Sequence, residues 1–163
     1  MRFIICGCEK AVMEYLVDTL GLIARRERSH LTVTAPDEHE RNDDMCRYVT
    51  FGEDVHTDIG KGMADALIVY KYSAGIRRIE NLKNSGKLIL VQDEEHTRRM
   101  RCGGSAGGSS QYDHSLSLKR EENYLKNLLY LKNDAVIVEK RSSAQELFRF
   151  YAEEEVLKLL GLR

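Results

Sequence analysis

Runs of consecutive apolar residues alternate along this chain with stretches in which apolar side chains recur at helical spacing. Short apolar runs are typical of strands buried on both faces, and a 3.6-residue period indicates amphipathic helices. The predicted strands are residues 2–6, 31–34, 67–70, 88–91 and 135–139. The predicted helices are residues 10–25, a segment between Ser73 and Gly86, residues 121–131 and residues 144–160. This alternation predicts an α/β fold with three αβα layers and a Rossmann-like, mainly parallel sheet.

Two features refine this layout. Strands 2–6 and 31–34 are joined by a helix, so a right-handed parallel crossover is expected between them. Residues 46–51 and 55–57 alternate in polarity around a break at 52–54, which predicts a half-exposed hairpin at an edge of the sheet or on an excursion from it. Downstream, Ser73 is placed to cap a helix that Gly86 closes before the strand at 88–91. We expect a single domain over residues 1–163.

The periodic pattern stops over residues 93–117. Gly and Ser cluster at 103–110, which predicts a flexible loop. A phosphate-binding Walker loop would need a preceding apolar strand and a Gly-Lys-Ser/Thr sequence leading into a helix, and both are missing. Binding of a phosphate or an acidic partner by Arg98, Arg99 and Arg101 stays open as the alternative.

Charge and composition exclude several function classes. The 163 residues carry 25 basic and 26 acidic side chains, a net charge of -1, so nothing draws the whole chain to nucleic acid or to an anionic membrane. The apolar run 3–6 is too short for a signal peptide or a membrane span. We therefore expect a cytoplasmic protein with no nucleic-acid or membrane partner.

The four cysteines lack the paired spacing of zinc or iron-sulfur sites, so no metal is predicted. A mixed site using Cys6, Cys8 and either His39 or His56 is the alternative, although unclustered cysteines are usually small buried hydrophobes. The same two histidines flank an acidic turn and could act as an acid-base pair, but no orienting partner is evident.

The turn after the first predicted strand is where a doubly wound fold would place a ligand. Only Gly7 remains of the three glycines in a dinucleotide fingerprint, and Glu9 would repel phosphate. Cys8 suggests a different chemistry, because the following helix N-terminus and Lys10 would favour its thiolate. A thiol-dependent enzyme centred on Cys8 is therefore one hypothesis, although a cysteine phosphatase would need arginine where Glu14 stands.

Three stretches carry a family resemblance. Residues 8–12 (CEKAV) match a Gly-Gly-Gln-Gly-Val turn, and residues 40–43 (ERND) match a turn with Arg-Gly-Gly. A longer motif, which ends in Ala-Asp and an apolar strand, is matched by residues 47–52, 55–59 and 62–68. In this order and spacing, residues 2–92 resemble the gamma subunit or gamma domain of the 2-oxoacid:ferredoxin oxidoreductases, which act on pyruvate, 2-ketoisovalerate or indolepyruvate. A weaker match covers residues 135–147.

The resemblance implies an accessory, non-catalytic subunit of a complex that decarboxylates a 2-oxoacid oxidatively. It implies that this chain binds no cofactor, and that thiamine diphosphate, CoA and iron-sulfur clusters belong to catalytic partner subunits. The implied contact residues lie in the two turns: Gly7, Cys8, Glu9, Lys10, Arg41, Asn42 and Asp43.

The family's glycines are replaced in both turns, and side chains fill space that glycine leaves open. This departure supports an alternative, a stand-alone binding or scaffold protein of the same fold. The predicted helix 144–160 carries more apolar residues than one stripe requires, so a homodimer also stays open.

Overall fold

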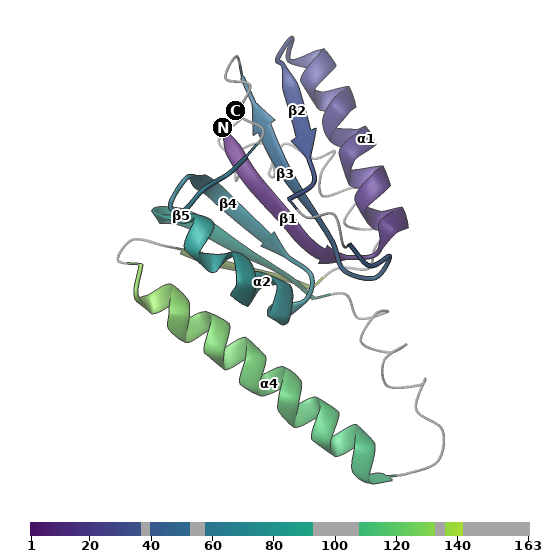
Figure 1. Ribbon diagram of the computed structural model, residues 1–163, viewed down its shortest axis with the longest axis vertical. Helices are drawn as coiled ribbons and strands as arrows, with labels where there is room; N and C mark the ends of the chain where they lie inside the picture. The colour runs from purple at the N-terminus through teal and green to yellow at the C-terminus, as the bar shows by residue number, and fades with distance from the viewer. Residues whose placement is uncertain (37–39, 53–57, 93–107, 133–135, 142–163) are drawn as a thin grey trace.

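The structure is a computed structural model that describes residues 1–36, 40–52, 58–92, 108–132 and 136–141. Its strands form one six-stranded sheet in the order β2-β3-β1-β4-β5-β6 (Figure 1). The strands are β1 Arg2–Cys8, β2 Leu31–Thr34, β3 Met45–Phe51, β4 Ala64–Val69, β5 Leu82–Gln92 and β6 Val136–Arg141. The helices are α1 Lys10–Arg26, α2 Tyr72–Arg78 and α4 Gly108–Tyr130, with the 3-10 turn η1 at Ile79–Asn81.

Five of these six strands run in the same direction. β1, β4, β5 and β6 pair in parallel, while β3 runs antiparallel to both β1 and β2. Helices lie on both faces of the sheet, with α1 on one side and α2 and α4 on the other (Figure 1). The predicted α/β fold with a mainly parallel sheet is confirmed. In the described part of the chain, the helices include none long and apolar enough to span a membrane.

The alternation of side chains along β1 divides the apolar core between the two faces. Phe3 and Ile5 pack with Met13, Leu16 and Leu20 of α1, and all five side chains are buried. The ring of Phe3 also stacks on that of Phe51, with 5.9 Å between the ring centroids. The amphipathic helix predicted over residues 10–25 therefore covers the sheet with its apolar face.

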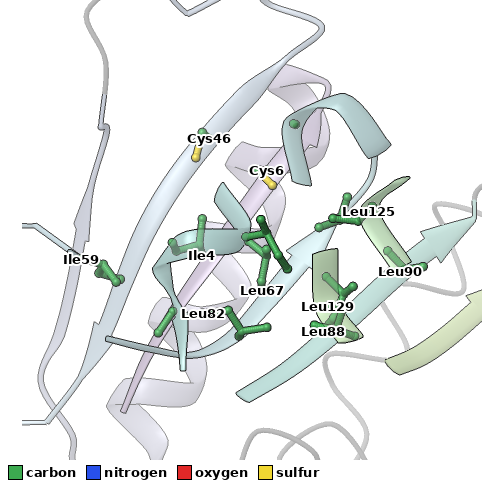
Figure 2. Close-up of a cluster of buried hydrophobic side chains, with 14 of the residues drawn as sticks. Ile4, Cys6, Cys46, Ile59, Leu67, Leu82, Leu88, Leu90, Leu125 and Leu129 are labelled. Atoms are coloured by element: carbon green, nitrogen blue, oxygen red, sulfur yellow. The ribbon is translucent and has the colours of Figure 1, made fainter. Parts of the chain in front are cut away.

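The opposite face of the sheet is covered by α2, η1 and α4. Ile4 and Leu67 point into this second cluster, where they meet Leu82 and two leucines of α4, Leu125 and Leu129 (Figure 2). Gly75 allows the close contact between α2 and α4, because a Cβ there would lie 3.0 Å from Cδ2 of Leu125. The long α4 is thus anchored by the apolar residues near its C-terminal end.

The predicted hairpin of residues 46–51 with 55–57 is wrong in its pairing. β3 lies inside the sheet, where β1 and β2 occupy its two edges, and residues 53–57 lie outside the described part of the chain. An antiparallel hairpin does lie at the edge of the sheet, but β2 and β3 form it. The polar positions that suggested exposure have partners or are buried, since Arg47 binds Glu40 and Thr50 is buried.

The position of β3 also changes the first crossover. β1 and β2 run in the same direction, as expected from the helix that connects them, but β3 separates the two strands. The chain leaves β1, crosses over through α1 to the edge, and then turns back to fill the gap. Local periodicity does not encode this return, because it depends on a pairing of residues about forty to fifty positions apart.

Several predicted boundaries move as well. α2 ends at Arg78, its N-cap is Lys71 rather than Ser73, and β5 begins at Leu82. Gly86 lies within β5 and closes no helix; a Cβ there would lie 2.5 Å from Cδ1 of Leu82. α4 begins at Gly108, so residues 108–117 of the predicted loop are helical. The rest of that loop, 93–107, and the predicted helix 144–160 lie outside the described residues.

The packing of α4 on α2 predicts the effect of a single truncation. Leu125 is fully buried, so Leu125→Ala should lower the free energy of unfolding by about 2–4 kcal/mol through lost burial and the remaining cavity. Its neighbour Tyr124 is 54% exposed, and Tyr124→Ala should change that free energy by less than about 1 kcal/mol. Urea unfolding followed by circular dichroism measures both. Equal losses in the two variants would contradict the observed orientation of α4.

Candidate functional site

Two turns meet at the carboxyl end of β1. The first, residues 7–10, connects β1 to α1, and the second, residues 41–44, precedes β3. The backbone N–H of Lys10 donates to the carbonyl oxygen of Asn42 at 2.7 Å, and within the second turn the N–H of Asp44 donates to the Arg41 carbonyl at 3.0 Å. These paired turns, as we call residues 7–10 and 41–44, contain every contact residue that the sequence suggested. The structure brings all seven together.

A third segment braces the second turn. Lys71 follows β4, and its ammonium group donates to the backbone carbonyl of Asp43 and to Oδ2 of the same residue, the latter at 3.1 Å. The hydrogen bond from Lys71, together with its charge, lowers the pKa of Asp43 below its usual value. Six residues further along the chain, in α2, Arg77 binds Oδ2 of Asp44 at 2.7 Å. Both aspartates are therefore held by cations from the α2 segment.

Gly7 is required where β1 approaches the start of α2. Its φ angle is +80°, a conformation that residues with a side chain rarely adopt. A Cβ at this position would also lie 2.6 Å from the backbone nitrogen of Lys71. The sequence presented Gly7 as the remnant of a phosphate-binding fingerprint. In the structure it permits the close contact between two backbone segments.

The surface of the paired turns is polar and carries both signs of charge. Glu9, Lys10, Arg41, Asn42 and Asp43 are all exposed, with Lys10 and Glu14 forming an ion pair at 3.7 Å along α1. Across the described ranges, the structure contains no cluster of three or more residues suited to hold a metal ion. The arrangement is suited to contact a polar partner surface, because its charged groups face solvent and its backbone is fixed by hydrogen bonds.

Cys8 lies at the end of β1 on the face covered by α1, and its side chain is only 3% exposed. Burial raises the pKa of the Cys8 thiol to about 12, and a hydrogen bond at the Cys8 backbone offsets only part of that shift. The predicted activation by the helix N-terminus is therefore wrong, because desolvation disfavours the thiolate more than the helix favours it. The thiol-enzyme hypothesis loses its nucleophile.

The alternative metal site is not assembled either. Cys6 and Cys8 point to opposite faces of the sheet because the pairing of β1 with β3 shifts register between them, and each belongs to a different apolar cluster. The two histidines considered with them, His39 and His56, lie outside the described residues, so the proposed acid-base pair stays a prediction.

Sequence reasoning missed the charged groups that support the turns. Glu40 accepts a hydrogen bond from the Cys46 N–H at 2.9 Å and another from Nη1 of Arg47 at 2.6 Å. Lys71 and Arg77 reach the second turn from positions about thirty residues away. In the sequence, Glu40 is one of several acids in a polar stretch, and nothing distinguishes its carboxylate from those of its neighbours. The pairing of strands reveals its role.

Comparisons with known proteins give only a weak structural likeness. No protein-family model matches this sequence, and no curated protein resembles it closely enough to count as a match. Among solved structures, the chain is similar to the PORC subunit of pyruvate oxidoreductase from Thermotoga maritima, with 15% identity and a TM-score of 0.39. The alignment covers 61% of this chain and about half, 55%, of the PORC chain. A likeness of this extent does not assign the chain to a family.

The backbone contact at Gly7 can be tested with two glycine substitutions. Gly7→Ala should lower the free energy of unfolding by about 2–4 kcal/mol, because the added Cβ meets the Lys71 backbone and the positive φ is strained. Gly21 lies in α1 with open space around it, so Gly21→Ala should instead stabilise the protein by about 0.5–1 kcal/mol. Chemical denaturation curves give both values. A neutral Gly7→Ala would contradict the close approach.

The buried state of Cys8 predicts slow alkylation in the native protein. At pH 7–8 its thiol should react with iodoacetamide at least about a hundredfold more slowly than it does in urea, because the thiolate is rare and the sulfur is covered. Peptide mapping by mass spectrometry after timed quenching measures the rate. Rapid alkylation of Cys8 in the folded protein, with the pH dependence of an ordinary thiol, would restore the hypothesis that Cys8 is a nucleophile.

Proposed function

We propose that this chain is an accessory, non-catalytic subunit of a 2-oxoacid:ferredoxin oxidoreductase, and that it binds the catalytic subunits through the paired turns. One observation carries the proposal. The two stretches that resemble the family's motif turns are about thirty residues apart in sequence, yet they are joined by the hydrogen bond from the Lys10 N–H to the Asn42 carbonyl. They meet at the edge of the sheet where the parallel strands β1 and β4 end, which supports a shared contact surface, since open α/β sheets bind ligands and partners there.

The fixed geometry of the second turn supports a role in protein binding. Ion pairs from Lys71 and Arg77 hold Asp43 and Asp44, and such exposed pairs add little to stability. They do restrict the turn before a partner arrives, which lowers the entropy cost of association. Arg41 lies between these constraints with an exposed side chain, and arginine is enriched among the residues that dominate protein interfaces.

In this proposal the chemistry belongs to the partner subunits. Thiamine diphosphate, CoA and the iron-sulfur clusters are bound there, and this chain binds none of them. We further propose that the complex is cytoplasmic and that its 2-oxoacid is pyruvate or indolepyruvate. The burial of Cys8 is compatible with a subunit that contributes no nucleophile.

A second candidate, a stand-alone binding protein of the same fold, is favoured by the residues that replace the family's glycines. Glu9, Asn42 and Asp43 are exposed on the paired turns, so their side chains occupy the surface where the family has bare backbone. A catalytic subunit whose surface fits glycine turns would meet these side chains in place of bare backbone. Such a protein would retain the surface and recognise a different partner.

Co-purification from the source organism tests the proposal. A tagged full-length chain should recover thiamine diphosphate-dependent subunits, identified by mass spectrometry, and the recovered complex should oxidise a 2-oxoacid with ferredoxin or a viologen dye as electron acceptor. Arg41→Glu should reduce that recovery about fivefold or more by reversing an exposed contact charge. The matched control is Arg25→Glu, a charge reversal on the exposed last turn of α1, which should leave recovery unchanged.

Two outcomes would contradict the subunit proposal. One is recovery of the chain alone, with no 2-oxoacid oxidation after candidate catalytic subunits are added. The other is equal recovery with Arg41→Glu and Arg25→Glu, which would place the contact away from the paired turns. Recovery of a different specific partner that is lost in Arg41→Glu would support the stand-alone candidate.

A further inference from the structure

Two cysteines lie directly opposite each other on neighbouring strands. In the antiparallel pairing of β1 with β3, Cys6 is the partner of Cys46. Both side chains belong to the apolar cluster on the α2 face (Figure 2). Cys8 lies on the other face, opposite Met45. Cys6 and Cys46 are thus a specific pair, and Cys8 is excluded from it by the register shift of β1 between Cys6 and Cys8.

The hydrogen-bond pattern identifies the type of this pair. Met1 and Phe51 exchange two hydrogen bonds, from the Met1 amino group to the Phe51 carbonyl at 2.7 Å and from the Phe51 N–H to the Met1 carbonyl at 2.8 Å. Antiparallel pairs alternate between hydrogen-bonded and non-hydrogen-bonded, and Cys6–Cys46 is five positions further along. It is therefore a non-hydrogen-bonded pair.

The peptide groups of the two cysteines agree with this assignment. The Cys46 N–H donates away from β1, to Oε1 of Glu40 at 2.9 Å, and the Cys6 carbonyl accepts from the Tyr70 N–H at 3.0 Å on the β4 side. In non-hydrogen-bonded pairs the Cα atoms are about 4.5 Å apart and the side chains approach most closely. A disulfide bond needs a Cα separation of about 4.4–6.8 Å, so the ladder already holds both residues at bonding distance.

We propose that Cys6 and Cys46 form a reversible intramolecular disulfide by exchange with a small-molecule disulfide of the glutathione class. The thiolate of one cysteine attacks the small disulfide, which gives a mixed disulfide and releases one small thiol. The second cysteine then attacks the protein sulfur of that mixed disulfide and releases the other small thiol. In total, two protein thiols lose two electrons and two protons, and the small disulfide becomes two thiols.

Burial sets the order of these steps. Cys46 is 8% exposed and Cys6 only 1%, so Cys46 reacts first and Cys6 completes the exchange. Burial also raises the pKa of the Cys6 thiol well above its usual value, with the neighbouring Cys46 adding to the effect. The exchange therefore proceeds through transient opening of β3 and is slow in the closed fold.

The bond would join the two segments that carry the paired turns. Cys6 directly precedes Gly7, and Cys46 follows Asp44 with one residue between them. Oxidation would thus lock the first turn to the second, in addition to the hydrogen bond between Lys10 and Asn42. This inference does not depend on the proposed function, because it concerns only chemistry within the chain.

The test uses the full-length chain in buffers of oxidised and reduced glutathione at graded ratios, followed by acid quenching, alkylation with N-ethylmaleimide and tryptic mapping. We expect a crosslinked peptide that joins residues 3–10 to residues 42–47, and its loss on treatment with dithiothreitol. By closing a loop of about forty residues, the bond should raise the melting temperature by about 5–15 °C relative to the reduced chain.

Variants identify the sulfurs, because Cys6 and Cys8 lie in the same tryptic peptide. Cys8→Ala should retain the crosslink and Cys6→Ala should abolish it. The proposal is overturned if the wild-type chain, shown to be folded by circular dichroism, gives no crosslink at the most oxidising ratio. It is equally overturned if the crosslink survives in Cys6→Ala, or if only glutathione adducts or intermolecular disulfides form.

Discussion

The complete burial of β1 is the constraint on which the rest of the structure depends. Phe3, Ile4 and Ile5 have no exposed surface, so both faces of this strand need a covering layer. Buried backbone groups also need hydrogen-bond partners on both edges, which β3 and β4 provide. The two helical layers cover the two faces of β1, and the placement of β3 between β1 and β2 provides hydrogen-bond partners for one of its edges.

The same central position creates the candidate site. At the carboxyl end of β1 the chain must leave the sheet, and the segments after β4 and before β3 end beside it. Gly7 allows the approach of the Lys71 backbone, and the side chains of Lys71 and Arg77 then reach the aspartates of the second turn. The paired turns are thus ordered by packing first and by charge second. Exposed ion pairs of this kind orient groups more than they stabilise the fold.

Burial decides what the cysteines can do. For Cys8 it removes the reactivity that a position before a helix suggested, because a desolvated thiol keeps its proton. For Cys6 and Cys46 the sheet that buries them also places them opposite each other on the same face. The chemistry of each thiol therefore depends on the strand pairing around it, and neither outcome follows from the spacing of the cysteines in sequence.

The sequence by itself determined the kinds of elements and the layers they form. Apolar runs predicted β1, β4 and the end of β5, and the stripe of Met13, Leu16 and Leu20 lies where a covering helix requires it, since burial on one or two faces leaves a periodic trace in the residues themselves. It also placed the two turns after predicted strands, because the carboxyl ends of strands that run in the same direction lie at one edge of a sheet.

Only the tertiary structure decided which strands are neighbours and which charges meet. Polar Arg47 and Thr50 made β3 look half exposed, but Glu40 and the surrounding sheet satisfy them inside the fold. The contacts from Lys71 to Asp43 and between the Cys6 and Cys46 positions join segments about thirty to forty residues apart. Such pairings depend on how buried surfaces and backbone hydrogen bonds are satisfied by the whole chain, and local periodicity contains no record of them.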